Sequence, residues 1–354
     1  MKVVTILGAR PQFIKAAAVS RALRRRHDEL IVHTGQHYDA LMSDVFFSEL
    51  GIPAPDITLQ VGSAPHGAQT GRMLEGIESV LLRERPDVVL VYGDTNSTLA
   101  GALAAAKLGI AIVHVEAGLR SFVRNMPEEI NRVLTDRLST LCCCPSDVAR
   151  ANLAAEGITD GVQVIGDVML DALTDAATRV GDASWRLEAF GVRPHEYVLA
   201  TVHRAANTDD TERLRAIVSA FGALSDAVLW PMHPRTRQVL ARESIALPAN
   251  VQVCEPLGYL DLVCALSQAR VAVTDSGGLQ KEAYWLGVPC VTLRDETEWT
   301  ETVDSGWNVL ADADVDRIVH GVRDAKPPAT ARDAYGEIGA ATRVVLAMES
   351  AFGA

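Results

Sequence analysis

Short apolar, β-rich runs alternate with helix-like runs along nearly the whole chain of 354 residues, and this alternation constrains the fold more than any other feature. The first series of strand-like runs occupies residues 3–7, 30–34, 87–93, 110–115 and 139–144, and a second series occupies 197–203, 227–233, 250–256, 270–276 and 289–293. Helix-like patterns such as 66–84 lie between them. Strands that alternate with helices form parallel sheets covered on both faces. The sequence therefore predicts an α/β fold with two doubly wound parallel sheets.

The strand–helix alternation restarts after about residue 166, which divides the chain into two halves. A chain of this length exceeds a typical single core, and two domains of roughly 150–180 residues are expected. We place the first domain at 1–168 and the second at 169–333, with segment 164–185 as the connection. Two such domains facing each other leave a cleft, and ligands of doubly wound sheets bind at the carboxyl ends of the strands.

Composition and charge narrow the classes of function. The formal net charge is −12, and the short basic run at 21–27 is typical of a solvated helix end, so nucleic-acid binding is not expected. The N-terminal residues lead directly into a strand-like run without a signal peptide, and no apolar stretch is long enough to span a membrane. The sequence therefore predicts a cytoplasmic protein with no membrane association.

Three consecutive cysteines, Cys142, Cys143 and Cys144, raise the possibility of a metal site. Adjacent residues of a strand point to opposite faces, so these three thiols cannot all reach one ion. Small apolar residues in a buried strand are the favoured interpretation. We expect no metal.

Two of the apolar runs end on a carboxylate: VYGDTNSTLAG (91–101) on Asp94 and VHVEAGLRS (113–121) on Glu116. One strand-terminal acid is often only a turn or cap residue, but two at the expected ligand-binding edge favour a functional role. A further pair, Glu128 and Glu129, follows Pro127 in a pattern typical of a helix start, where acids also stabilise the helix dipole.

Anion-binding residues are indicated at the ends of other strand-like runs. In GARPQFIK (8–15), Arg10 and Lys15 lie near a helix N-terminus, where cations are unfavourable unless an anion binds, although both could be solvated surface charges. The histidines His203 and His233 end two further strand-like runs, and Arg204 follows the first. A lone histidine is more often structural, whereas this repeated placement favours an anion-binding edge.

A small-residue turn, Ser276-Gly277-Gly278, separates a strand-like run from a helix-like run in the second half. Glycines there let backbone amides approach a diphosphate, and Glu282, about one turn later, could accept hydrogen bonds from a ribose diol. The same three residues could form only a turn. Neither a dinucleotide-binding G-x-G-x-x-G after a strand nor a P-loop occurs, so no nicotinamide cofactor is indicated.

Eight segments together resemble one known family. In order they are GARPQFIK, GQHYD, VYGDTNST, HVEAGLR, MPEEINR, TVHR, TDSGGLQKEA and LRDETEW, and they extend from residue 8 to 299. They are similar to the non-hydrolysing UDP-N-acetylglucosamine 2-epimerases. The resemblance implies the GT-B fold, with two Rossmann-like domains facing a cleft, a C-terminal helix over 334–354 that packs back on the first domain, and a homodimer. It also implies a UDP-sugar substrate, no cofactor, and inversion at C2 by elimination of UDP to a 2-acetamidoglucal and re-addition.

The resemblance also implies roles for individual residues. The acid–base carboxylates would be Asp94, Glu116 and Glu128, and His203 would assist departure and return of UDP. Contacts to UDP or the sugar would come from Arg10, Lys15, Arg120, Arg132, Arg204, His233, Leu257, Tyr259, Ser276, Gly277, Gly278, Glu282 and Arg294, with Leu257 and Tyr259 in the turn that meets the uracil. Gln36 and Arg72 match a possible allosteric site.

The chain departs from the family pattern in three places. The segment after HVEAGLR is the short SFVRNM, which resembles the branch that includes archaeal members and epimerases for diacetamido-glucuronate substrates. Asp39 differs from the pattern associated with allosteric binding, and Ala206 stands where an acid is common. The alternatives to a UDP-N-acetylglucosamine epimerase are therefore an epimerase for a UDP-diacetamido-uronic acid or a natural-product nucleotide sugar, a GT-B glycosyltransferase, and a non-catalytic UDP-sugar sensor.

Overall fold

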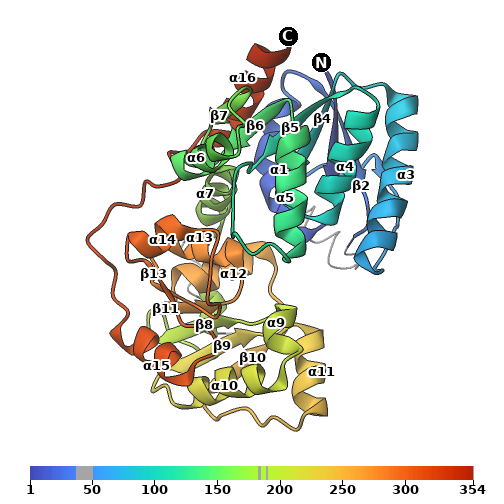
Figure 1. The fold of residues 1–354 in the computed structure, drawn as a ribbon. Helices are drawn as coiled ribbons and strands as arrows, with labels where there is room; N and C mark the ends of the chain where they lie inside the picture. The colour runs from blue at the N-terminus through green and yellow to red at the C-terminus, as the bar shows by residue number, and fades with distance from the viewer. Residues whose placement is uncertain (37–50, 182–184, 189, 354) are drawn as a thin grey trace. The chain divides into compact units, whose positions relative to one another are not determined.

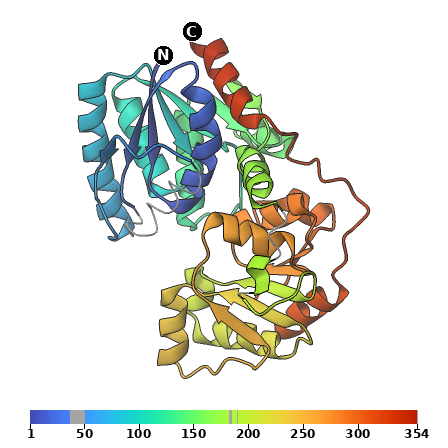
Figure 2. The ribbon, with the colours of Figure 1, turned by 180° about the vertical axis from the view of Figure 1, so that it is seen from behind.

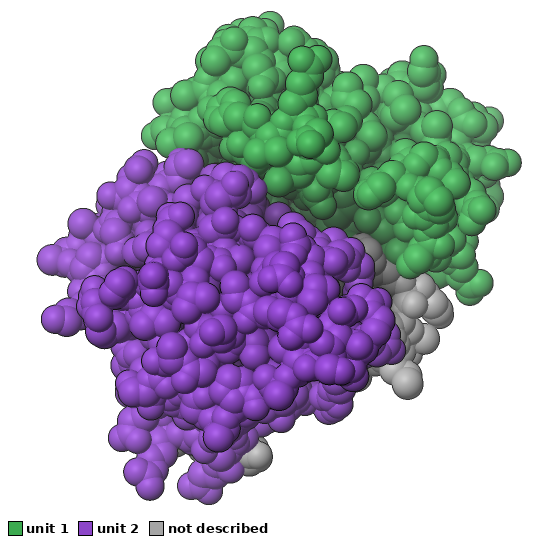
Figure 3. Space-filling model, turned by 60° about the horizontal axis from the view of Figure 1, so that its bottom comes forward, with its two compact units in different colours: residues 1–174, 335–354 green, residues 175–334 purple. Residues whose placement is uncertain are grey.

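The chain forms two compact units (Figure 3). The computed structural model describes residues 1–36, 51–181, 185–188 and 190–353, with Arg10, Trp185 and Arg186 described by their backbone alone. The first unit comprises Met1–Thr174 and Tyr335–Ala354, and the second comprises Asp175–Ala334. The chain passes from the first unit to the second within helix α7 (Val168–Val180).

The first unit contains a parallel sheet in the order β3-β2-β1-β4-β5-β6-β7 (Figure 1). Its strands are β1 (Lys2–Leu7), β2 (Asp28–His33), β3 (Ile57–Thr58), β4 (Val88–Tyr92), β5 (Ala111–Val115), β6 (Leu141–Cys144) and β7 (Val162–Val164). The order reverses between β1 and β4, which creates a topological switch point where the carboxyl ends of these strands diverge. The sequence pattern missed β3 and β7, because strands of two and three residues are too short to form an apolar run.

Helices flank this sheet on both faces (Figure 1). They are α1 (Arg10–Leu23), α3 (His66–Glu84), α4 (Asn96–Lys107), α5 (Pro127–Leu138), α6 (Asp147–Ala155), α7 and α16 (Ala340–Phe352). The pattern at 66–84 predicts α3 with its observed bounds. None of the helices in the described ranges is both long enough and apolar enough to cross a membrane.

The C-terminal helix α16 lies against α1 in the first unit (Figure 2). His27 Nε2 and Arg26 Nε lie 3.0 and 2.8 Å from Glu349 Oε1, so charged contacts accompany the packing. The helix starts only at Ala340, because Gly339 adopts a left-handed conformation with φ of 103°.

The second unit contains a parallel sheet in the order β10-β9-β8-β11-β12-β13. Its strands are β8 (Tyr197–Thr201), β9 (Ala227–Pro231), β10 (Val251–Cys254), β11 (Val271–Thr274), β12 (Cys290–Thr292) and β13 (Asn308–Leu310). Its helices are α8 (Trp185–Glu188), α9 (Ala205–Thr208), α10 (Thr211–Gly222), α11 (Pro234–Arg242), α12 (Tyr259–Ser267), α13 (Gly277–Leu286), α14 (Thr300–Asp304) and α15 (Val315–Asp324). Its switch point lies between β8 and β11. The expected α/β fold with two doubly wound parallel sheets is therefore confirmed.

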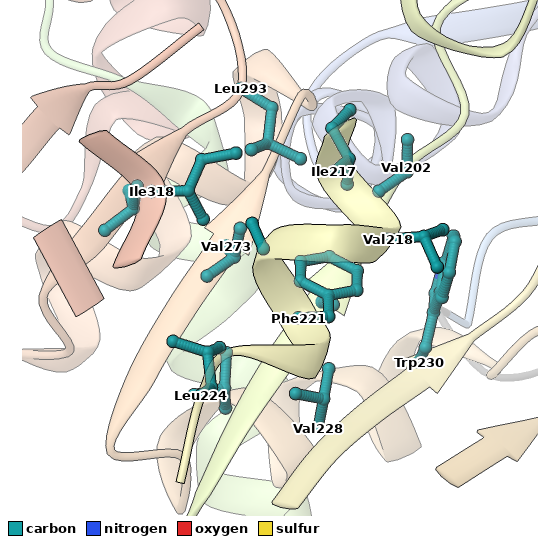
Figure 4. Close-up of a cluster of buried hydrophobic side chains, with 14 of the residues drawn as sticks. Val202, Ile217, Val218, Phe221, Leu224, Val228, Trp230, Val273, Leu293 and Ile318 are labelled. Carbon is teal, nitrogen blue, oxygen red and sulfur yellow. The ribbon is translucent and has the colours of Figure 1, made fainter. Parts of the chain in front are cut away.

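The core of the second unit shows how the helical apolar pattern is buried (Figure 4). Ile217, Val218 and Phe221 of α10 pack towards the sheet, and all three are buried. Phe221 meets Trp230 of β9 edge to face, with ring centroids 5.4 Å apart. Truncating such a buried aromatic residue to alanine typically costs about 3–5 kcal/mol.

The three adjacent cysteines are buried in β6, as the favoured interpretation predicts. Burial raises the pKa of each thiol well above its ordinary value, so all three remain protonated and unreactive at neutral pH. Among the described residues, no group of three or more histidine, cysteine, aspartate or glutamate side chains is arranged to hold a metal ion.

Candidate functional site

The carboxyl ends of β4 and β5 carry the two acids that the sequence singles out. Asp94 follows β4 after Gly93, and Glu116 follows β5 directly. Because β4 and β5 are paired neighbours, these residues lie at the same edge of the first sheet. Gly93 and Glu116 both have positive φ angles, 60° and 71°, which turn the chain sharply at this edge. For a residue other than glycine, such a backbone is strained, and strain of this kind concentrates at functional sites.

Glu116 forms an ion pair with Lys15 of α1. The carboxylate side chain is 4% exposed and the lysine side chain 10%, so the pair is largely screened from water. A Cβ on Gly93 would lie 3.1 Å from Lys15 Nζ and 3.3 Å from Glu116 Oε2, so the glycine leaves room for the pair as well as adopting the turn. Lys15, expected to contact phosphate, thus approaches a carboxylate. The side chain of Arg10 lies outside the described part of the structure.

Asp94 is held by two consecutive residues of α5. Arg132 Nη2 lies 2.6 Å from Asp94 Oδ2, and Asn131 Nδ2 donates to the Asp94 carbonyl over 2.9 Å. The Asp94 side chain nevertheless remains 31% exposed, whereas Arg132 is buried at 3%. Asp94 is therefore a carboxylate that is held in place and that a ligand can still reach. Arg132, expected among the substrate contacts, is placed beside it.

The two acids at the start of α5 have different surroundings. Glu128 is exposed, whereas Glu129 is buried. The Glu129 carboxylate accepts hydrogen bonds from the backbone N–H groups of Ser121 and Phe122, at 3.0 and 3.1 Å. Phe122 is held at φ 61° with its side chain 77% exposed. Glu129 thus anchors the short segment 121–126, whereas Glu128, expected among the acid–base carboxylates, is exposed at the start of α5.

A buried charged network lies beneath the two strand-end acids. His114 of β5 contacts Asp136 of α5, with Nδ1 2.7 Å from Oδ1, and its Nε2 lies 2.7 Å from the Gly93 carbonyl oxygen. Arg120 contacts Asp136 Oδ2 at 2.7 Å and the Glu156 carboxylate at 2.7 and 2.8 Å. Arg120, expected among the substrate contacts, therefore binds protein carboxylates here.

Sequence reasoning missed His114 and Asp136 as parts of this site, and it singled out Glu129 only as one of two acids at a helix start. The signal for His114 was a polar residue inside an otherwise apolar strand, IVHV, which needs a buried partner. That partner, Asp136, lies 22 residues away and has no local signature.

In the second unit, Asp275 organises the carboxyl ends of β8 and β11. It is fully buried, and its carboxylate accepts hydrogen bonds from the backbone N–H of His203 at 3.0 Å and of Arg204 at 3.0 Å. Asn207 Nδ2 donates to it over 3.2 Å. The His203 side chain is 49% exposed, with Nδ1 3.4 Å from Asp275 Oδ1. His203 and the Ser276 turn thus lie at one sheet edge, since Thr201 and Thr274 are partners in register.

The predicted small-residue turn begins helix α13. Ser276 is its N-cap, and its side chain accepts from Leu279 N over 3.5 Å. A Cβ on Gly277 would lie 2.6 Å from Glu298 Oε1, so only glycine fits without displacing that acid. Arg294 Nη2 binds Glu298 at 2.8 Å and is buried. The free N–H groups of a helix start are suited to phosphate. Gly278 lies in the first turn, and Glu282 is buried on the same helix.

The remaining predicted residues occupy separate places. His233 caps α11, and its Nδ1 accepts from Arg235 N over 3.2 Å. Leu257 is half-buried before α12, and Tyr259 is buried at its start. Gln36 is buried and accepts from Ser97 Oγ at 2.8 Å, whereas Arg72 is exposed on α3. Asp39 lies outside the described residues.

Comparison with known proteins places these features in one family. The family model for UDP-N-acetylglucosamine 2-epimerase matches residues 21–349. A UDP-N-acetylglucosamine 2-epimerase homolog of Methanococcus maripaludis is 50% identical over 351 residues, covering 98% of each chain. A UDP-2,3-diacetamido-2,3-dideoxy-D-glucuronate 2-epimerase of Pseudomonas aeruginosa is 51% identical over 331 residues, covering 91% of this chain and 92% of the relative.

A solved structure is also similar over almost the whole chain. It is the UDP-GlcNAc 2-epimerase of Methanocaldococcus jannaschii in complex with UDP-GlcNAc and UDP, with a TM-score of 0.92 and 41% sequence identity. The match covers 99% of this chain and 100% of that one. The likeness confirms the expected GT-B fold class.

Proposed function

The chain belongs to the UDP-N-acetylglucosamine 2-epimerase family, a family of isomerases, and from this premise we propose that it inverts C2 of a UDP-linked N-acetylhexosamine. The simplest substrate is UDP-N-acetylglucosamine, with UDP-N-acetylmannosamine as the product. The observation that supports this proposal is the pair of acids at adjacent strand ends, Asp94 and Glu116, each paired with a cation. Acid–base chemistry at a carbon centre needs carboxylates that are held in place in this way.

In the proposed reaction, removal of the C2 proton is coupled to the loss of UDP, because no carbonyl is adjacent to C2 to stabilise a carbanion. A carboxylate takes the C2 proton, the C2–H electron pair forms the C1–C2 double bond, and UDP leaves with the electron pair of the C1–O bond. The intermediate is a 2-acetamidoglucal with a C1–C2 double bond. UDP then adds back to C1, and an acid delivers a proton to the opposite face of C2. Asp94, Glu116 and the exposed Glu128 are the proposed acid–base groups.

The second unit is proposed to hold UDP while it is a leaving group. The start of α13, with Ser276 and Gly277, supplies backbone N–H groups for the diphosphate. His203 and Arg204, whose backbone is tied to Asp275, add side chains of suitable chemistry. We further propose that Glu282 binds the ribose and that the turn at Leu257 and Tyr259 meets the uracil. Stabilising the leaving diphosphate is the main electrostatic task of such a reaction.

A second candidate substrate is a UDP-linked diacetamido-glucuronate. The relative from Pseudomonas aeruginosa that is named for this substrate is as similar to this chain as the archaeal homolog, at 51% and 50% identity. The reaction at C2 would be the same, and only the recognition of C3 and C6 would differ.

Proton NMR of the purified protein in D₂O tests both candidates. With UDP-N-acetylglucosamine, we expect deuterium at C2 and a growing UDP-N-acetylmannosamine signal. C2 exchange only with the UDP-diacetamido-glucuronate would identify that UDP-sugar as the substrate and would support the same reaction at C2. Absence of C2 exchange with both UDP-sugars, in a protein that binds them, would overturn the proposed function, and UDP release that depends on an acceptor would indicate glycosyl transfer.

A further inference from the structure

The two ring nitrogens of His114 both face hydrogen-bond acceptors. Nε2 lies 2.7 Å from the Gly93 carbonyl oxygen, and a carbonyl can only accept, so this nitrogen carries a proton. Nδ1 lies 2.7 Å from Asp136 Oδ1, while Oδ2 of the same carboxylate accepts from Arg120 Nη1 at 2.7 Å and from Gly118 N at 3.2 Å. An ionised carboxylate has no proton to give, so Nδ1 must donate as well.

Ionisation of Asp136 is supported by its surroundings. Burial alone would raise its pKa, but the contacts with His114 and Arg120 hold the pKa below its ordinary value. Arg120 favours the ionised carboxylate whatever the state of His114, because its guanidinium Nη1 lies 2.7 Å from Oδ2. We infer that His114 is a buried imidazolium that donates from both ring nitrogens and positions the turn at Gly93 and, through it, the carboxylates of the proposed active site.

Charges of alternating sign compensate the cost of burying this cation. Three ion pairs link these groups in a row: His114 pairs with Asp136, Asp136 with Arg120, and Arg120 with Glu156 at the end of α6. The imidazole and the Asp136 carboxylate are both fully buried. Among the other described groups nearby, Cys142 of β6 is a neutral thiol, because burial raises its pKa. A buried ion is tolerated when it is paired and hydrogen-bonded in this way.

Both polar backbone groups of Gly93 form hydrogen bonds with β5. Its N–H donates to the Val115 carbonyl at 3.0 Å, and its carbonyl accepts from His114. Gly93 immediately precedes Asp94, and a Cβ added to it would lie 3.1 Å from Lys15 Nζ and 3.3 Å from Glu116 Oε2. Loss of the imidazolium would release this turn and displace both acids. This positioning role, unlike the charge of His114, rests on the proposed function.

Nitrogen-15 NMR of protein labelled at histidine tests the charge without reference to activity. We expect both ring nitrogens of His114 to show protonated shifts. His33 is an internal contrast, because burial lowers its pKa to about 4 and leaves its ring neutral. Assignment comes from the signals lost in His114→Gln. A shift typical of an unprotonated nitrogen in His114 would overturn the inference.

Kinetics test the positioning role. In His114→Gln we expect kcat to fall by ~10-fold or more, since small misplacements of reacting groups have large effects, with KM changed by less than about 3-fold. Asp136→Asn should act in the same direction, and the exposed His320→Gln is the matched control. A normal kcat in folded His114→Gln would overturn this role. If the wild type epimerises neither UDP-sugar, the proposed function and the positioning role both fail, while the NMR result still decides the charge of His114.

Discussion

Lys15 of α1 and Glu116 at the end of β5 form a buried ion pair across 101 residues of sequence. The pair joins the first helix of the unit to the strand edge that carries the proposed acid–base groups. Removing one partner of a buried pair leaves an uncompensated charge, which typically costs about 3–5 kcal/mol. Each partner therefore contributes to the stability of the first unit as well as to its proposed chemistry.

Lys15→Met should lower the free energy of unfolding of the first unit by about 3–5 kcal/mol, because the buried Glu116 carboxylate loses its ion pair with the Lys15 ammonium group. The double variant Lys15→Met/Glu116→Gln should be less destabilised than the single one. Urea unfolding followed by methionine-methyl NMR can separate the units, since Met73 lies in the core of the first and Met232 in that of the second. Equal losses in the single and double variants would contradict the role of the pair.

Asp94→Asn and Glu116→Gln should each cut turnover by at least ~10²-fold, because each removes a proposed acid–base group. The affinity for UDP should remain within a few-fold of the wild type, since the proposed nucleotide contacts lie in the second unit. Turnover is measured by C2 deuterium incorporation and UDP affinity by calorimetry. The exposed Asp147→Asn on α6 is the matched control. Wild-type turnover in both variants would refute their role.

The neighbours Glu128 and Glu129 should respond differently to the same substitution. Glu129→Gln should lower the unfolding free energy of the first unit by about 1–3 kcal/mol, because the amides of Ser121 and Phe122 lose a charged acceptor. Glu128→Gln should leave stability within about 0.5 kcal/mol, as is usual for an exposed position, while turnover falls by ~10-fold or more. The Met73 signal in urea and the rate of C2 exchange report the two effects. Similar stability losses in both variants would contradict this division of roles.

Asp275→Asn should weaken UDP binding by about 10-fold, or 1.4 kcal/mol. The amide NH₂ of asparagine would face the backbone N–H groups of His203 or Arg204, so the turn that presents these side chains would lose its order. Calorimetric titration with UDP measures the change. Asp209→Asn is the control, because the Asp209 side chain forms an exposed ion pair with Arg235. An unchanged Kd in a folded Asp275→Asn protein would exclude this positioning.

The first unit should lose stability as the pH falls below about 6.5, because of His33. Burial lowers its pKa from 6.5 to about 4, so the unfolded chain takes up a proton in this window that the folded chain does not. Above pH 6.5 His33 does not change the free energy of unfolding. Near pH 4 it lowers that free energy by about 3 kcal/mol. His33→Phe, which keeps a ring beside Phe13, should flatten this part of the pH profile of the Met73 unfolding midpoint. Parallel profiles for both proteins would show that His33 does not contribute.

The sequence by itself determined the fold class, the two sheets and the strand ends. Strand periodicity, the helical pattern at 66–84 and the acids Asp94 and Glu116 after apolar runs are local features, and local features can be predicted from consecutive residues. The sequence did not predict the short strands β3, β7 and β13, because two or three residues are too few to show a periodic pattern. These strands form because they pair with neighbouring strands of their sheets.

Only the tertiary structure decided which side chains meet. It buries Glu129 and leaves Glu128 exposed. It also pairs Lys15 with Glu116 and places His114 beside Asp136. These contacts link residues on different strands and helices, and no spacing along the chain encodes them. Burial then sets their physical consequences, because a charge inside a protein is stable only beside a partner that the fold supplies.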